Sequence, residues 1–140
     1  MSKTYADQHD DLVDLARTIV GVVRQAEPGW LNALARGRLA LAKAVNEHVT
    51  AETALIRQVR PDTRRHQALL TRYHDELLAW RRDLIENNAR WHMKAIADDP
   101  DGFVQDYRPL LTALEARVAW EEAEFYPQVL HVADLTRLAA

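Results

Sequence analysis

The chain lacks cysteine entirely and has a single serine, Ser2. The absence of cysteine excludes disulfides, thiolate metal ligands and thiol nucleophiles. Because Ser2 stands alone, no Ser-His-Asp set can be assembled either. Any enzymatic activity would have to come from a bound redox metal. The residues therefore leave open whether the protein is an enzyme, and they favour a non-enzymatic role.

An excess of one charge and long apolar runs are also missing. The 18 basic and 21 acidic residues give a formal net charge of -3, so no overall positive field favours nucleic acid or an anionic membrane. No stretch approaches the roughly 18 apolar residues that a membrane-spanning helix needs, and the N-terminal MSKTYADQHDD has no signal-peptide apolar region. We therefore expect a cytoplasmic protein that binds neither nucleic acid nor membranes.

Helix-breaking residues are sparse, with 4 Gly and 5 Pro in 140 residues. The segments between them are rich in Ala, Leu, Arg and Glu and show no period-two alternation, which favours helix. The sequence predicts four helices, at 5–26, 31–59, 62–97 and 103–130. Short connections between four helices predict an all-α fold, an up-down-up-down antiparallel four-helix bundle that forms one domain over residues 1–140.

Three residues set the predicted starts of the last two helices. Asp62 is the predicted N-cap of the third helix, and Asp101 is that of the fourth, followed by a tight turn at Gly102. Pro109 would remove one hydrogen bond from the second turn of the fourth helix. That helix is therefore predicted to start nearer residue 107.

Polar residues occupy positions on the second and fourth helices that a bundle should bury. Each helix of a bundle buries a seam whose positions alternate by three and four residues. His48 and Glu52 lie on the seam of the second helix, flanked by apolar residues, and Glu121 lies on that of the fourth. Buried carboxylates are costly unless a cation neutralises them.

Histidines extend this pattern to the other two helices. His9 lies on the seam of the first helix, and on the third helix two registers compete, one placing His74 inward and the other His66. Each helix thus offers an imidazole or a carboxylate toward one axis, and these are ligands of borderline metal ions. His48 and Glu52 are one turn apart, with Cβ atoms about 6 Å apart, so a single ion can reach both.

Short motifs along most of the chain resemble the hemerythrin-like, or HHE cation-binding, family. The family pattern is a His on the first helix, His-x-x-x-Glu on the second, and the same again on the third and fourth. This sequence has QHDDL with His9, EHVTAE with His48 and Glu52, YHDEL with His74, and ARVAWEEAEFYP with Glu121. The closing EExxFYP is similar to the helix-ending motif of the family. The resemblance implies a four-helix bundle with a metal site formed by those five residues.

Spacing favours His74 over His66 as the third-helix ligand. The interval from His9 to His48 is 39 residues. The interval from His74 to position 117 is closer to this value than the interval from His66 to position 117. Position 117 itself departs from the family pattern, because Arg117 stands where the fourth helix should supply a histidine.

Arg117 and Leu78, which stands where the third helix should carry its second histidine, weaken the case for a full site. Arginine does not ligate metals, so a complete di-iron oxygen-carrier site is not expected. Arg117 could instead reach Glu121 one turn later and supply the positive charge of a lost second metal. Glu122, the next residue, is expected to face solvent.

The resemblance implies a protein that senses, binds or detoxifies oxygen, nitric oxide or peroxide. Its cofactor would be one or two non-haem metal ions, with iron the leading candidate and Mn or Zn as alternatives. The alternative is a metal-free bundle with a degenerate site, in which Arg117, Glu121, Glu52 and histidines form a polar network and the protein acts as a regulatory or protein-interaction module. The sequence specifies no protein partner, and it leaves monomer and homodimer open.

Overall fold

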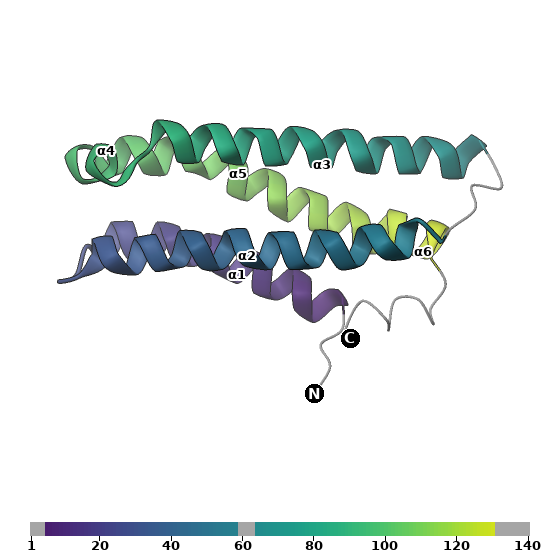
Figure 1. The fold of residues 1–140 in the computed structure, drawn as a ribbon, viewed down its shortest axis with the longest axis horizontal. Coiled ribbons are helices and arrows are strands. Elements are labelled where there is room, and N and C mark those ends of the chain that lie inside the picture. Colours follow the sequence, from purple (N-terminus) through teal and green to yellow (C-terminus); the bar gives the residue numbers. More distant parts are fainter. Residues whose placement is uncertain (1–4, 59–63, 131–140) are drawn as a thin grey trace.

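The computed structural model describes residues 5–58 and 64–130, and Figure 1 shows them as helices joined by short connections. No strand occurs among these residues, so the predicted all-α class is confirmed. The elements, in chain order, are α1 (Tyr5–Gln25), α2 (Trp30–Ile56), α3 (Arg64–Arg90), α4 (Met93–Asp98), α5 (Pro100–Trp120), the π-helical segment η1 (Glu121–Phe125) and α6 (Tyr126–Val129). None of the described helices is long and apolar enough to cross a membrane.

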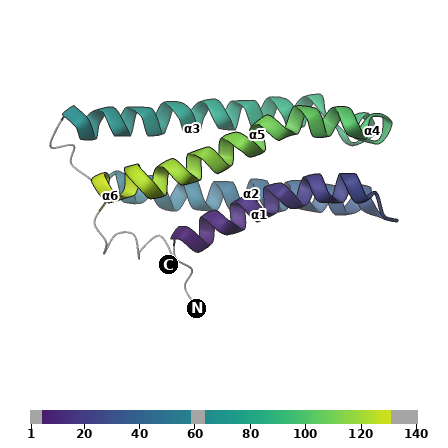
Figure 2. The same ribbon diagram turned by 180° about the vertical axis from the view of Figure 1, so that it is seen from behind.

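The four long helices, α1, α2, α3 and α5, lie lengthwise beside one another. α1 packs along α2 and also contacts α5, which in turn contacts α3. Figures 1 and 2 show from two sides that α5 starts near the end of α3 and finishes, through η1 and α6, close to the C-terminal end of α2. This course brings residues near position 121 to the part of α2 that carries His48 and Glu52.

Two apolar clusters fill the interior, and polar residues lie between them. The larger cluster runs through α1, α2 and α5, and the smaller one surrounds Phe125. On α2, Val45 belongs to the larger cluster and Leu55 to the smaller, and the buried residues between them are His48 and Glu52. Each fully buried large apolar side chain contributes roughly 1.5–3 kcal/mol, so the two clusters hold the helices in place around the polar residues.

The first two helices follow the predicted boundaries closely. α1 ends at Gln25, and α2 runs from Trp30 to Ile56. Residue 59, the predicted end of the second helix, and Asp62, the predicted cap of the third, lie outside the described residues.

The predicted third helix, 62–97, is interrupted. α3 ends at Arg90, and α4 begins after His92, whose Nδ1 accepts the Ala95 N–H at 3.2 Å and so caps the new helix. At the break, Arg38 of α2 donates to the Trp91 carbonyl at 2.8 Å. The prediction of one continuous helix was wrong because a side chain from another helix satisfies the backbone at this point.

α5 begins earlier than predicted. Its N-cap is Asp99, whose side chain accepts the Gly102 N–H at 3.0 Å, and Pro100 occupies its first turn. The predicted cap at Asp101 and the predicted turn at Gly102 were therefore wrong: Gly102 is helical, and an added Cβ there would overlap the Asp99 carboxylate. The predicted start near residue 107 was also wrong, since the helix runs through Pro109, which is exposed.

Candidate metal site

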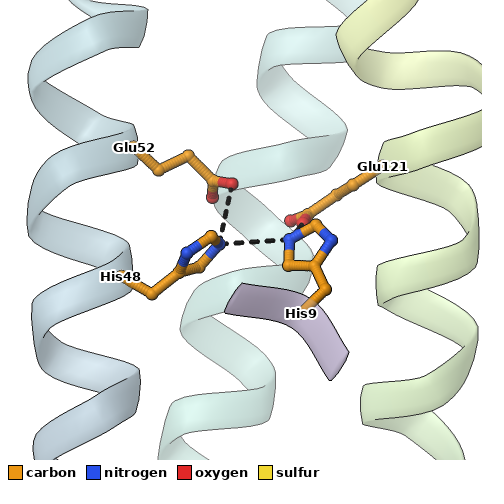
Figure 3. Close-up of side chains that lie close together, drawn as sticks. All are labelled: His9, His48, Glu52 and Glu121. Carbon is orange, nitrogen blue, oxygen red and sulfur yellow. Dashed lines mark hydrogen bonds and ion pairs between the residues drawn. The ribbon is translucent and has the colours of Figure 1, made fainter. Parts of the chain in front are cut away.

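Four of the five sequence-predicted ligands lie together in the interior. His9 comes from α1, His48 and Glu52 come from α2, and Glu121 begins η1. Figure 3 shows the four side chains pointing toward one another. One ligand atom from each lies within 4.8 Å of every other, and each side chain is buried.

The fifth predicted ligand, His74, lies outside this cluster. It is on the exposed face of α3, and the inward position belongs to its neighbour Tyr73, which is fully buried. The inward placement of His74 was wrong because the register with Tyr73 inside also buries Trp80 and Leu84, and so removes more apolar surface from water. His66 is only partly buried and is not in the cluster either.

The two histidine rings of the cluster meet at their Nε2 atoms, which are 3.1 Å apart. Nδ1 of His9 faces Glu122 Oε1 at 3.0 Å, and Nδ1 of His48 faces Gln8 Oε1 at 2.7 Å. A carboxylate or amide oxygen can only accept a hydrogen bond, so each Nδ1 carries a proton. In the neutral rings both Nε2 lone pairs then point at each other. A cation satisfies this arrangement, either as a proton on one ring or as a metal ion that both rings share.

Each buried carboxylate turns one oxygen toward the histidines and the other away from them. Oε2 of Glu52 lies 3.2 Å from His48 Nε2, and Oε2 of Glu121 lies 3.1 Å from His9 Nε2. On the other side, Oε1 of Glu52 accepts a hydrogen bond from the Tyr73 hydroxyl. The Oε2 atoms are therefore the ones available to an ion between the histidines.

Arg117 is a buried cation beside the outer oxygen of Glu121. Its Nη2 lies 3.0 Å from Glu121 Oε1, so the predicted ion pair between these residues is confirmed. The same Nη2 donates to the Tyr73 carbonyl at 3.2 Å, and the guanidinium lies over the Tyr73 ring, 4.7 Å from its centroid. These contacts fix the positive charge on the side of Glu121 that faces away from the histidines.

The π-helical turn of η1 brings Tyr126 into the cluster. The Tyr126 N–H donates to the Glu121 carbonyl five residues earlier. In an α-helix, five residues would leave the two side chains roughly 140° apart, whereas in the wider π turn five residues complete nearly one turn. The Tyr126 hydroxyl donates to Glu52 Oε2 and lies 3.1 Å from His9 Nε2 and 3.3 Å from Glu121 Oε2. Such turns are frequent at functional sites.

Sequence reasoning missed several residues that hold the cluster together. Tyr126 and Gln8 carried no prediction, and Tyr73 was an inward position only in the register that places His66 inward, with no role in the site. Glu122, expected to face solvent, is partly buried and hydrogen-bonded to His9. A signal existed for Tyr126 in Pro127, which has no N–H to continue the α-helical hydrogen bonds and so indicates an irregular turn nearby.

The charge of the cluster depends on His9. Burial lowers the pKa of His9, but the hydrogen bond and charge of Glu121, together with Glu122 and Glu52, outweigh burial and raise the pKa above its ordinary value of 6.5. The surroundings therefore attract a positive charge to this ring.

Glu52 is held in its ionised form, and the two phenols that donate to it keep their protons. Burial raises the pKa of Glu52, but the hydrogen bond and charge of His48, with hydrogen bonds from Tyr126 and Tyr73, bring it below the ordinary value of 4.5. For both tyrosines, burial and then the charge of Glu52 raise the pKa far above its usual range.

A cavity of about 30 Å³ adjoins the cluster. The four clustered side chains and Arg117 form its polar wall, and its apolar wall includes Leu12, Val45, Leu77 and Trp80. This volume suits one water molecule or a ligand of similar size. The arrangement can therefore place a small molecule against the histidines and carboxylates while excluding larger ones.

The donor set fits a metal ion. Two imidazole nitrogens and two carboxylate oxygens suit Fe, Mn and Zn. Adjacent ligands around such an ion stand about 3.0–3.4 Å apart, given metal–ligand distances of about 2.1 Å. Adjacent donor atoms here are 3.1 to 3.2 Å apart. The outer hydrogen bonds from both Nδ1 atoms match the way in which metal-binding histidines are usually held.

Comparison of the chain with family models, curated proteins and solved structures finds no match.

Proposed function

We propose that this chain is a hemerythrin-like protein, an up-down-up-down antiparallel four-helix bundle that holds one non-haem metal ion between His9, His48, Glu52 and Glu121. Iron is the leading candidate, with Mn or Zn as alternatives. The observation that carries the proposal is the pair of Nε2 atoms 3.1 Å apart. Both rings direct their Nδ1 protons to outer acceptors, so two lone pairs and two buried carboxylates converge on one point.

One ion is proposed instead of two because the outer oxygens of the carboxylates already have partners. Glu52 Oε1 accepts from the Tyr73 hydroxyl, and Glu121 Oε1 is paired with Arg117. A bridging carboxylate would need those oxygens for a second ion. Arg117 supplies the positive charge that the second ion would otherwise bring.

Iron bound in this way would supply a redox-active Lewis acid. The surrounding residues would set its environment. Glu122 and Gln8 hold the two rings in the tautomer that presents Nε2, and Arg117 pairs with Glu121 in the interior. The adjoining cavity of about 30 Å³ restricts the ligand to small molecules. Oxygen, nitric oxide and peroxide are of this size, and the proposed role is to sense, bind or detoxify one of them.

A metal-free role is the second candidate, and one observation favours it. Both oxygens of Glu52 accept hydrogen bonds from tyrosines, and Glu121 lies between Arg117 and His9. With His9 protonated, the buried charges balance without any metal. In this case the cluster is a structural polar network, and the protein acts through contacts with a protein partner.

Metal content separates the two candidates. Untagged protein grown with iron would be analysed by plasma mass spectrometry as wild type, as the double variant His48→Ala with Glu52→Ala, and as His74→Ala. We expect about one metal per chain in the wild type and its loss in the double variant. The His74→Ala control should keep its metal, because His74 is exposed and outside the cluster.

Two results would contradict the metal-binding role of the cluster. A wild type without metal, whose thermal midpoint does not change when Fe, Mn or Zn is added, would rule out the metal-binding role and leave the polar network. Equal metal loss in His74→Ala and in the double variant would mean that the metal is not bound specifically by the cluster.

A further inference from the structure

Tyr126 lies beside three of the four proposed ligands, His9, Glu52 and Glu121. It is fully buried, and its hydroxyl oxygen is 3.1 Å from His9 Nε2, 3.3 Å from Glu121 Oε2 and hydrogen-bonded to Glu52 Oε2. We propose that Tyr126 is a fifth ligand of this site and binds a trivalent ion, ferric iron first, as a phenolate. The inference rests on the proposed function, since it requires the metal site.

Two features fix the position of the Tyr126 oxygen. The ring stacks on His9, with centroids 5.6 Å apart and planes 13° apart, and the π turn sets the backbone from which it projects. Its separations from His9 and Glu121 match the roughly 3.0–3.4 Å expected between neighbouring ligands of one ion. Two of the three separations therefore fit a place in the ligand set, whereas the phenol oxygen and the hydrogen-bonded Glu52 Oε2 would have to move apart when both bind the ion.

The hydroxyl proton of Tyr126 conflicts with metal binding by its neighbours. It is donated to Glu52 Oε2, and the nearby Glu121 Oε2 and His9 Nε2 are proposed ligands as well. Each of these atoms would direct a lone pair to the ion and so displace the proton. In the resulting step the O–H bond of Tyr126 breaks, a bond from its oxygen to the ion forms, and the proton leaves to the buffer.

Charge favours the phenolate form when the ion is trivalent. Among the buried charged groups, Glu52 and Glu121 each count as one negative charge and Arg117 as one positive charge, leaving one net negative charge. A divalent ion beside a neutral phenol brings the site to one positive charge. A trivalent ion beside a phenolate gives the same value, whereas a trivalent ion beside a phenol would leave two positive charges in a buried site.

Tyr73 is the natural control, because it is a second buried phenol that donates to the same carboxylate. Its hydroxyl donates to the other oxygen, Oε1, and its ring lies beneath Arg117. Tyr73 is therefore placed on the side away from the histidines. It should support Glu52 without binding the ion.

The test uses ferric iron as the probe. Wild type, Tyr126→Phe and Tyr73→Phe chains would be loaded with ferric iron, their iron content measured by plasma mass spectrometry, and their visible spectra recorded. A phenolate bound to ferric iron gives an intense charge-transfer band in the visible region. We expect this band, normalised to iron, in the wild type and in Tyr73→Phe, and its loss in a Tyr126→Phe chain that still holds iron.

The outcomes separate this inference from the proposed function. A wild type that holds iron without the band, or a band that persists in Tyr126→Phe, overturns phenolate binding and leaves the four-ligand site standing. A wild type that binds no iron overturns both. If circular dichroism shows that Tyr126→Phe does not fold, resonance Raman spectra decide: tyrosinate vibrations in the wild type that survive in Tyr73→Phe support Tyr126, and their absence from the wild type overturns it.

Discussion

Arg117 Nη2 and Glu121 Oε1 form an ion pair of 3.0 Å in which both side chains are buried. The pair joins residues one turn apart, Arg117 near the end of α5 and Glu121 at the start of η1. Among the described residues, the other terminal nitrogen of Arg117, Nη1, has no hydrogen-bond partner. The guanidinium is therefore stabilised in the interior chiefly by the charge of Glu121, and the two residues depend on each other.

Replacing Arg117 should strongly destabilise the metal-free protein. Arg117→Met leaves Glu121 buried without its cation, and breaking a buried pair in this way costs roughly 3–5 kcal/mol. Urea unfolding of chelator-treated protein measures the change. Added metal should recover part of the loss, because the ion neutralises the same carboxylate.

The matched control for this prediction is Arg17→Met, which removes an exposed pair. Arg17 lies 3.3 Å from Glu115, and their side chains are 57% and 40% exposed. Exposed pairs contribute at most about 1 kcal/mol. Similar small effects from both variants would mean that the buried Arg117–Glu121 pair stabilises the fold no more than an exposed pair does.

Glu122 should control metal affinity although it is not a proposed ligand. It accepts the Nδ1 proton of His9 at 3.0 Å and so fixes which nitrogen faces the site. Removing such an outer acceptor typically lowers metal affinity about 10–100-fold, and we expect this from Glu122→Ala. Competition with a chelator measures it. Glu124→Ala, an exposed residue of the same π segment, should leave affinity unchanged; equal losses in both variants would argue for a general charge effect.

The residues of the site that could be predicted from the sequence lie on uninterrupted helices with apolar neighbours on both sides. His9, His48 and Glu52 are of this kind, and the alternation of three and four residues was enough to place them inward. Glu121 was predicted for the same reason, because α5 keeps its α-helical period up to that residue.

The remaining residues of the site depend on information that periodicity does not carry. Tyr73 and His74 are adjacent, and both registers of the third helix place Leu77 inward, so the burial of Trp80 and Leu84 decides between them. Tyr126 follows a π turn, and a period of 3.6 residues would place it away from Glu121. Similarly, the end of α3 depends on a hydrogen bond from Arg38, which is distant in sequence.

The start of α5 can be tested directly by replacing two neighbouring aspartates. Asp99 accepts the Gly102 N–H as the N-cap, so Asp99→Ala should cost roughly 0.5–2 kcal/mol of unfolding free energy. Asp101, the cap predicted from sequence, lies inside the first turn, where its charge interacts with the helix dipole, so Asp101→Ala should cost about 0.3–1 kcal/mol. Thermal or urea unfolding compares the two. A larger loss for Asp101→Ala would reverse the assignment.

Stability of the metal-free protein and its affinity for metal should respond to pH in opposite directions. Because the pKa of His9 is raised above 6.5, its protonated form stabilises the folded chain; this contribution is complete below pH 6.5 and is lost as pH rises through the raised pKa. The lowered pKa of Glu52 has the opposite effect on stability. Its ionised carboxylate stabilises the folded chain fully above pH 4.5, and this stabilisation is lost as pH falls through the lowered pKa.

Metal binding requires a neutral His9, so a metal must displace the proton that stabilises the metal-free form. Above pH 6.5 we therefore expect the unfolding free energy of chelator-treated protein to fall while metal affinity rises. His9→Gln should remove the decline in stability, whereas His92→Gln, which changes an exposed histidine, should keep it. If stability and affinity instead rose together in the wild type, His9 would not hold the proton that the metal replaces, and the facing Nε2 atoms would need another source of positive charge.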